Sequence, residues 1–165
     1  MAISATERLY NITHRMRAQV ATIAASLPGT PTVYLAEFER APGVDTKRIG
    51  VQVAAQPWTE LGNHLLTGHA LDGRALLTCD LFWVRAASGE DPLQIEKAAE
   101  ELAYGLDNLS LTHLDYSATF ASPTTTAGAR VQTLGRPEMI TLPPENDLLR
   151  RQVQAVIRWI VSTDQ

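Results

Sequence analysis

Histidine and cysteine are the residues of this chain with the clearest capacity for chemistry. The histidines are His14, His64, His69 and His113, and Cys79 is the only cysteine. His64 and His69 lie five positions apart, and this separation does not place both on one helical face as the closer spacing of helical metal-binding pairs does. We therefore interpret both as surface residues of a loop and expect no metal ion at this chain.

Cys79 and Asp80 lie together in the most apolar segment of the chain, residues 74–85. A catalytic cysteine needs a thiolate, a supporting base and some exposure to solvent. We therefore expect Cys79 to be a small buried core residue. A carboxylate in such a segment must face solvent or find a partner, and an arginine on a neighbouring strand, such as Arg158, could pair with Asp80 if the last segment is a strand.

Motifs for other chemistry are missing from the sequence. Gly62, Gly68 and Gly73 are widely spaced and lack the lysine and the strand-to-helix context of a phosphate-binding loop. No Gly-x-Ser-x-Gly elbow occurs. Glu100 and Glu101 are adjacent helical residues whose side chains diverge, unlike a facing acid–base pair. An enzyme would have to depend on scattered residues that this sequence alone does not reveal.

The composition predicts one domain over residues 1–165. Its 18 acidic and 14 basic residues leave a formal charge of −4, which argues against gripping nucleic acid as the main activity. A single cysteine excludes an internal disulfide and fits synthesis in a reducing compartment. No secretory signal or apolar run of membrane-spanning length is recognisable, and we expect no membrane partner.

The first predicted element is a helix over residues 4–27. An apolar stripe of Leu9, Ile12, Met16, Val20, Ile23 and Leu27 recurs at helical spacing. Ser4 and Glu7 have the spacing of a capping box, and residues 28–31 end the helix. The opposite face carries arginines, Arg15 among them, which we expect to be solvated.

The strands are predicted from alternation and apolar runs. Residues 32–40 and 49–53 are expected to form an antiparallel hairpin with a projecting loop at 41–48. Residues 74–85 read as a central strand covered on both faces, preceded by a long connection at 58–73. Residues 107–128 are expected to be irregular, with a short strand over 130–134.

A second helix is predicted over residues 91–106, with Asp91 as its N-cap and Pro92 in its first turn. Its buried stripe is Ile95, Ala98, Ala99, Leu102, Ala103 and Leu106. Residues 148–161 fit either a helix or a strand, and their β-branched residues favour a strand. Together these elements predict an α+β fold, a mixed or antiparallel sheet of about four to five strands with two helices packed on it.

The order of these elements resembles the tail terminator proteins of long-tailed bacteriophages, which include the lambda-type minor tail protein U and related tail-completion proteins. The resemblance covers most of the chain and is clearest over residues 73–106, where a strand is followed by Gly89-Glu90-Asp91-Pro92 and a helix with Ala98-Ala99 and Leu102-Ala103. It is a pattern of elements without an invariant signature. Residues 107–141 depart from the shortest members of the family.

The resemblance implies a structural protein of the virion, without enzymatic activity, cofactor or metal. Its copies would form a ring, six subunits in the family, that caps the completed tail tube, stops its polymerisation and joins it to the neck or head. DNA would be only transiting cargo, and assembly would take place in the host cytoplasm. Alternatives are another head–tail joining protein, such as a neck or stopper subunit, or a small cytoplasmic enzyme.

If the resemblance holds, the segments at 41–48 and 58–73 contact the tube or neighbouring subunits. Trp58 is the best candidate for an anchor, because tryptophan is enriched at interface hot spots; it could equally pack under its own loop. The residues that we expect at these contacts are Val44, Asp45, Lys47, Arg48, Trp58, Glu60, His64, Leu66, His69 and Arg74.

Overall fold

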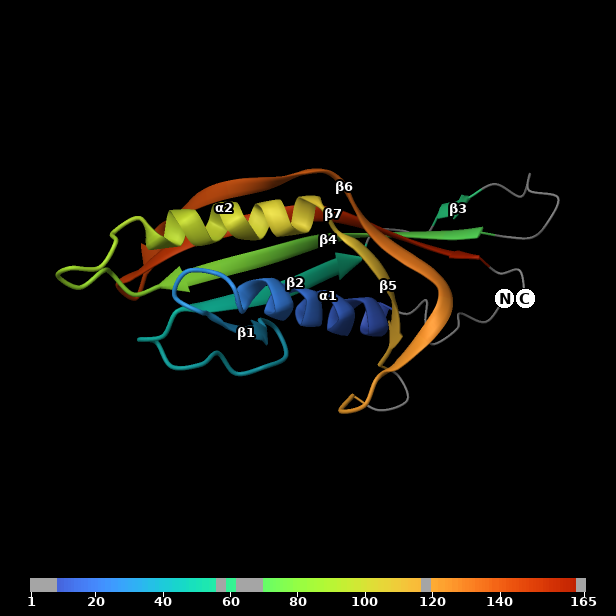
Figure 1. Cartoon of the computed structure of the whole chain (residues 1–165), viewed down its shortest axis with the longest axis horizontal. Helices are drawn as coiled ribbons and strands as arrows, with labels where there is room; N and C mark the ends of the chain where they lie inside the picture. The colour runs from blue at the N-terminus through green and yellow to red at the C-terminus, as the bar shows by residue number, and fades with distance from the viewer. Residues whose placement is uncertain (1–8, 56–58, 62–69, 117–119, 163–165) are drawn as a thin grey trace.

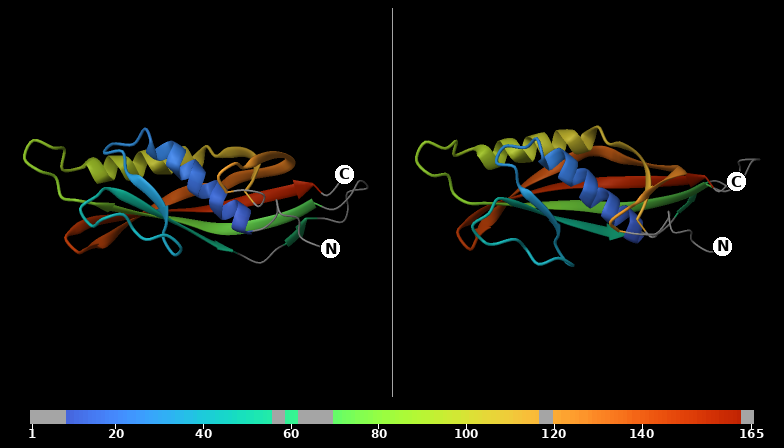
Figure 2. Two further views of the ribbon diagram at one scale, coloured as in Figure 1. Left: turned by 90° about the horizontal axis from the view of Figure 1, so that it is seen from below. Right: turned by 60° about the horizontal axis from the view of Figure 1, so that its bottom comes forward.

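A long curled sheet carries two helices on one of its faces (Figures 1 and 2). The computed structural model describes residues 9–55, 59–61, 70–116 and 120–162. In chain order the elements are α1 (Leu9–Ala24), β1 (Thr32–Leu35), β2 (Arg48–Ala55), β3 (Thr59–Leu61), β4 (Ala70–Trp83), α2 (Gln94–Asp107), β5 (Ser110–Asp115), β6 (Thr124–Glu145) and β7 (Leu148–Ser162).

The sheet runs in the order β1-β2-β4-β7-β6-β5, and the short β3 pairs with the beginning of β4. The predicted α+β class with a mixed sheet and two helices is confirmed for the part of the chain that the structure describes. The strand number is wrong, since the continuous path alone holds six strands. The additional strand on this path is β5, which lies, with the first part of β6, in a segment that we expected to be irregular.

β1 and β2 are parallel, so the predicted antiparallel hairpin is wrong. Thr32 pairs with Arg48 and Leu35 pairs with Val51. The chain turns away directly after β1, where Glu39 accepts the Leu35 N–H at 2.6 Å and donates its own N–H to the Leu35 carbonyl at 2.8 Å. It then returns through residues 40–47 and begins β2 beside the start of β1. Alternation of apolar residues identifies a strand but carries no information about its direction.

β4 is the central strand, as predicted, with β2 on one side and β7 on the other. Its inward side chains pack beneath the helices, and all are at most 2% exposed: Ala75, Leu77, Cys79, Leu81 and Trp83. The expectation of apolar cover on both faces is wrong. Both helices lie on one side of the sheet (Figure 2), and the intervening β4 side chains, Thr78, Asp80 and Phe82 among them, face away from them.

α1 buries the predicted stripe, with Ile12, Met16 and Val20 fully enclosed. Arg15, expected to be solvated, is instead only 2% exposed. Burial lowers the pKa of Arg15 to about 10, an effect that Tyr116 opposes. The proposed cap, Ser4 and Glu7, lies outside the described residues.

α2 begins at Gln94, later than the predicted start. Asp91 is not the N-cap; its Oδ1 accepts the Leu93 N–H at 2.9 Å and so holds the turn that precedes the helix. The predicted buried stripe is confirmed at Ile95, Ala98, Ala99, Leu102 and Leu106. Small alanine side chains let this helix approach β6 and β7 closely.

β6 and β7 form a long hairpin, so residues 148–161 are a strand, the alternative that we favoured. The hairpin turns at Asn146 and Asp147, whose φ angles are 49° and 63°, the left-handed conformations that a two-residue type I′ turn requires. Pro137, Pro143 and Pro144 all lie in β6 beyond its pairing with β5, which extends only to Gln132. Proline fits there because an edge strand does not need every backbone N–H.

Candidate interaction surfaces

The predicted loop at 41–48 is partly folded back onto its own chain. Val44 is 55% exposed and Asp45 is also exposed. Arg48 is the first residue of β2 and only 7% exposed, and its guanidinium reaches back to the carbonyls of Gly43 and Val44 at 3.4 and 3.5 Å. This leaves Arg48 little surface for a partner, whereas Val44 and Asp45 form an accessible tip.

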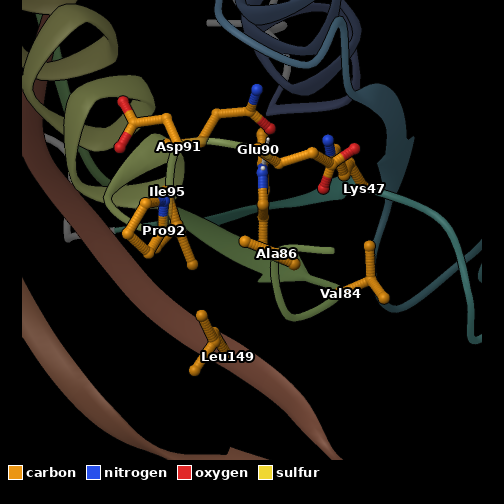
Figure 3. A pocket seen from close by; sticks show the side chains of 10 residues that line it. Lys47, Val84, Ala86, Glu90, Asp91, Pro92, Ile95 and Leu149 are labelled. Carbon is orange, nitrogen blue, oxygen red and sulfur yellow. Dashed lines mark hydrogen bonds between the residues drawn. The ribbon is translucent and has the colours of Figure 1, made fainter. Parts of the chain in front are cut away.

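Lys47 packs across the turn between α1 and β1. A Cβ placed on Gly29 would meet the Lys47 Cδ at 2.7 Å, so the aliphatic stem of Lys47 lies directly over Gly29. Lys47 and Glu90 both line a small pocket at the beginning of α2 (Figure 3). Trp83 and Gln94 line the same pocket, and the Trp83 indole N–H donates to the Gln94 Oε1 at 3.0 Å. This junction fastens β2, β4 and α2 together.

The second predicted contact segment, residues 58–73, is described only in part. Trp58, His64, Leu66 and His69 lie outside the described residues. Glu60 lies in β3, opposite Leu71 of β4. Residues 59–61 and 70–73 are therefore paired strand, where we had expected a polar connection.

Arg74 is exposed on β4, opposite Arg158 of β7. This pairing corrects the suggested partner of Asp80. Asp80 does find an arginine of the terminal strand, but it is Arg150, whose Nη2 lies 3.5 Å from Oδ1, and Gln152 donates to the same oxygen at 2.8 Å. The register of β4 with β7 determines that Arg150, and not Arg158, lies next to Asp80.

A polar network centred on Asp80 occupies the sheet face that the helices leave uncovered. Arg150 also pairs with Glu145 at 3.2 Å. The ring of Phe82 lies between two guanidinium groups, with the Arg48 Cζ 4.6 Å and the Arg150 Cζ 5.2 Å from its centroid. Such cation–π contacts and charge-assisted bonds hold long side chains flat on a sheet. They explain why Asp80 and Phe82 are nearly buried although no helix covers them.

An aromatic groove lies between the first turns of α1 and the end of β1. It measures about 420 Å³ and includes Tyr10, His14, Leu35 and Phe38 in its lining. The His14 ring lies 4.5 Å from that of Tyr10 and 4.7 Å from that of Phe120. Burial and the nearby Arg17 lower the pKa of His14, whereas Glu39 acts in the opposite direction.

Sequence reasoning missed this groove, although part of its signal was present. Tyr10 and His14 are four positions apart on one helix, a spacing that brings two rings together. Phe38 in the lining and Phe120 against the His14 ring come from segments distant from α1, so no local pattern indicates these contacts. Exposed aromatic side chains that gather in this way are typical of surfaces that bind other proteins.

The chemistry available at Cys79 is limited by its surroundings. Its side chain is fully buried, and burial together with the charge of Asp80 raises the pKa of the thiol. The prediction that Cys79 is a core residue is confirmed. Among the described residues, no group of three or more His, Cys, Asp or Glu side chains could hold a metal ion, and no helix is long and apolar enough to cross a membrane.

No protein-family model matches the chain, and neither does any curated protein.

Proposed function

We propose that this protein is a tail terminator of a long-tailed bacteriophage, a structural subunit that forms a ring at the head-proximal end of the tail tube. The ring, six subunits by resemblance, would stop tube polymerisation and join the tube to the neck or head connector. DNA passes through it only as cargo, and assembly takes place in the host cytoplasm before the ring becomes part of the virion.

The observation that carries this proposal is the asymmetry of the two sheet edges. β1 is the first strand of the sheet and is only four residues long, while β6 extends beyond β5 at the other end. These two edges differ in sequence and shape. Two different edges can pair head-to-tail between copies, and such heterologous contacts close into a ring when the rotation between subunits allows it.

The tip formed by Val44 and Asp45 supports a second contact along the axis of the ring. Both residues are exposed, and the return of the chain from Glu39 to β2 positions them. An exposed valine at the end of a firmly held loop suits a small docking contact. We assign this tip to the tail tube or the neck, the partners that the resemblance implies.

Light scattering after size exclusion and electron microscopy test the proposal, first on the protein alone and then with tail tube protein. We expect rings that bind tube ends and limit tube length. Val44→Asp should form rings but cap tubes poorly. Leu93→Asp changes a similarly exposed apolar residue at the beginning of α2 and serves as the matched control, which should cap normally.

A protein that stays monomeric at all concentrations and does not change tube length would overturn the proposal. Rings that bind the head connector but leave tube length unaltered would instead identify a neck or stopper subunit. Localisation of the subunit in intact virions then separates the two positions.

A further inference from the structure

Backbone groups of β2 point outward beyond the end of β1. The Ala36 N–H donates to the Val51 carbonyl at 3.0 Å, so the polar backbone groups of Val51 face the β1 side. Along a strand, the backbone N–H and C=O groups of successive residues point alternately toward one neighbouring strand and then toward the other. The backbone groups of Val53 and Ala55 therefore point to the same side of β2 as those of Val51. β1 ends at Leu35, opposite Val51, and no hydrogen bond from another described residue reaches the β2 edge at Val53 and Ala55.

The pairing registers carry the same alternation across the sheet to β6. The backbone N–H and C=O groups of even-numbered β2 residues point toward β4. Those of odd-numbered β4 residues point toward β7, and those of even-numbered β7 residues point toward β6. Ile140 pairs with Gln152, so the backbone groups of Ile140 face β7. Those of its neighbours Met139 and Thr141 therefore point away from the sheet.

Prolines bound this open stretch of β6. Pro137 precedes it, and Pro143 and Pro144 follow it. Because proline has no N–H, the outer edge between them can donate only within residues 138–142. Met139 is 53% exposed and Thr141 is also exposed. No hydrogen bond from another described residue reaches the outward backbone groups of either one.

We propose that copies of this protein join through these edges, with the β6 edge at Met139 and Thr141 pairing with the β2 edge at Val53 and Ala55 of the next copy. The inference rests on the proposed ring and names the surfaces that build it. Each joint would continue the sheet from one subunit into the next, a form of strand addition.

A second copy fits this edge in length and in chemistry. Residues 138–142 and residues 52–55 each span about 13–17 Å as extended chain. Met139 pairs with the inward residue Val153, and Val53 pairs with the inward residue Leu77, so both side chains lie on the helix side of the sheet. Pairing would bring the flexible, exposed methionine against the half-buried valine and cover both.

Proline substitutions test the two edges separately. Thr141→Pro removes an outward N–H from β6, and Val53→Pro removes one from β2; neither N–H donates to another residue that the structure describes. Each variant alone should sediment as a monomer, with association at least about tenfold weaker than in the unsubstituted protein. Thr141→Val and Val53→Ala keep the N–H groups and should still form rings.

Mixing the two proline variants gives the sharpest result. Each retains the edge that the other lacks, so the mixture should form a complex of two subunits and stop there. Amide hydrogen exchange gives a readout without substitution: the Met139, Thr141, Val53 and Ala55 amides should exchange more slowly in the oligomer than in dilute monomer.

The outcomes separate this inference from the proposed function. Rings that persist in both proline variants, or outward amides that exchange equally fast in monomer and oligomer, overturn the edge pairing and leave the ring proposal standing. Edge-paired oligomers that do not affect tube growth overturn the proposed function alone. A strictly monomeric protein overturns both. If circular dichroism shows that a proline variant is unfolded, amide hydrogen exchange of the unsubstituted protein decides whether the edges pair.

Discussion

Asp80 and Arg150 form a diagonal pair across β4 and β7: the register places Asp80 opposite Gln152, yet its Oδ1 lies 3.5 Å from the Arg150 Nη2. The Asp80 side chain is 11% exposed and that of Arg150 is 27% exposed. Replacing only one partner of an ion pair so little exposed to water is destabilising, because the remaining charge loses its partner without regaining full hydration. The pair thus ties the two longest-paired strands of the sheet together on the face without helices.

Asp80→Ala should lower the free energy of unfolding by about 2 kcal/mol, since Arg150 and Gln152 both lose their shared acceptor. Urea unfolding measures this change. In a double-mutant cycle, Asp80→Ala and Arg150→Met should be non-additive by about 1 kcal/mol. Arg158→Met is the matched control, and its effect should add to that of Asp80→Ala. Coupling to Arg158 instead of Arg150 would contradict the observed register.

Gly50 is required by the ring of Tyr34, which lies over it on the sheet. A Cβ at position 50 would meet the Tyr34 hydroxyl at 3.0 Å and Cζ at 3.1 Å. We expect Gly50→Ala to destabilise the fold by about 1–2 kcal/mol through overpacking. Tyr34→Phe should recover part of this loss in the double variant. Gly43→Ala, where a Cβ meets nothing within 4 Å, should change thermal stability little; equal effects at both glycines would refute the steric explanation.

The lowered pKa of His14 predicts a pH dependence of stability. The folded protein binds a proton here less readily than the unfolded chain, whose histidine titrates near 6.5. Neutral His14 therefore contributes fully to the stability of the folded protein above pH 6.5, and this contribution declines as pH falls from there toward the folded pKa. Unfolding measured across this range should show a steeper decline in the unsubstituted protein than in His14→Phe.

Tyr10→Phe is the control for that experiment, because it keeps the ring contact with His14 and introduces no titrating group. It should retain the pH dependence of the unsubstituted protein. Identical pH profiles for the unsubstituted protein and His14→Phe would show that His14 makes no contribution in this range.

Cys79 should resist thiol reagents while the protein is folded. Its thiol is fully buried, and its raised pKa keeps it protonated at neutral pH, whereas these reagents attack the thiolate. Labelling followed by mass spectrometry should be slow in buffer and complete in concentrated urea. Fast labelling of the folded protein would contradict the packing described around β4.

Local patterns predicted the elements that bury one apolar stripe. The α1 stripe through Ile12, Met16 and Val20 and the α2 stripe through Leu102 follow directly from helical periodicity. The apolar run around Cys79 likewise identified the central strand. In each case the spacing of apolar residues along one segment indicates which face is buried, so the local pattern is sufficient to predict the element.

Properties that depend on distant residues were not predictable in this way. The direction of β1 relative to β2 is fixed by the turn at Glu39, and alternation does not encode it. Most of β6 escaped prediction because threonine, glycine and proline interrupt its apolar residues, although its inward residue Val131 is buried by packing from elsewhere in the chain. The aromatic groove depends on how α1 packs beside the end of β1, and the Arg150 partner of Asp80 depends on the register of β4 with β7.

The order in which the strands are synthesised has a consequence for folding. β7 lies between β4 and β6 in the sheet but follows both in the chain. The two halves of the sheet, β1-β2-β4 and β6-β5, therefore cannot join until β7 has been made, and its pairs with β4 extend to Ala70 with Ser162. Such distant pairings favour slow folding. A nascent chain holds the β4 edge unpaired while residues 84–147 are made, so aggregation during translation is the main hazard that this topology creates.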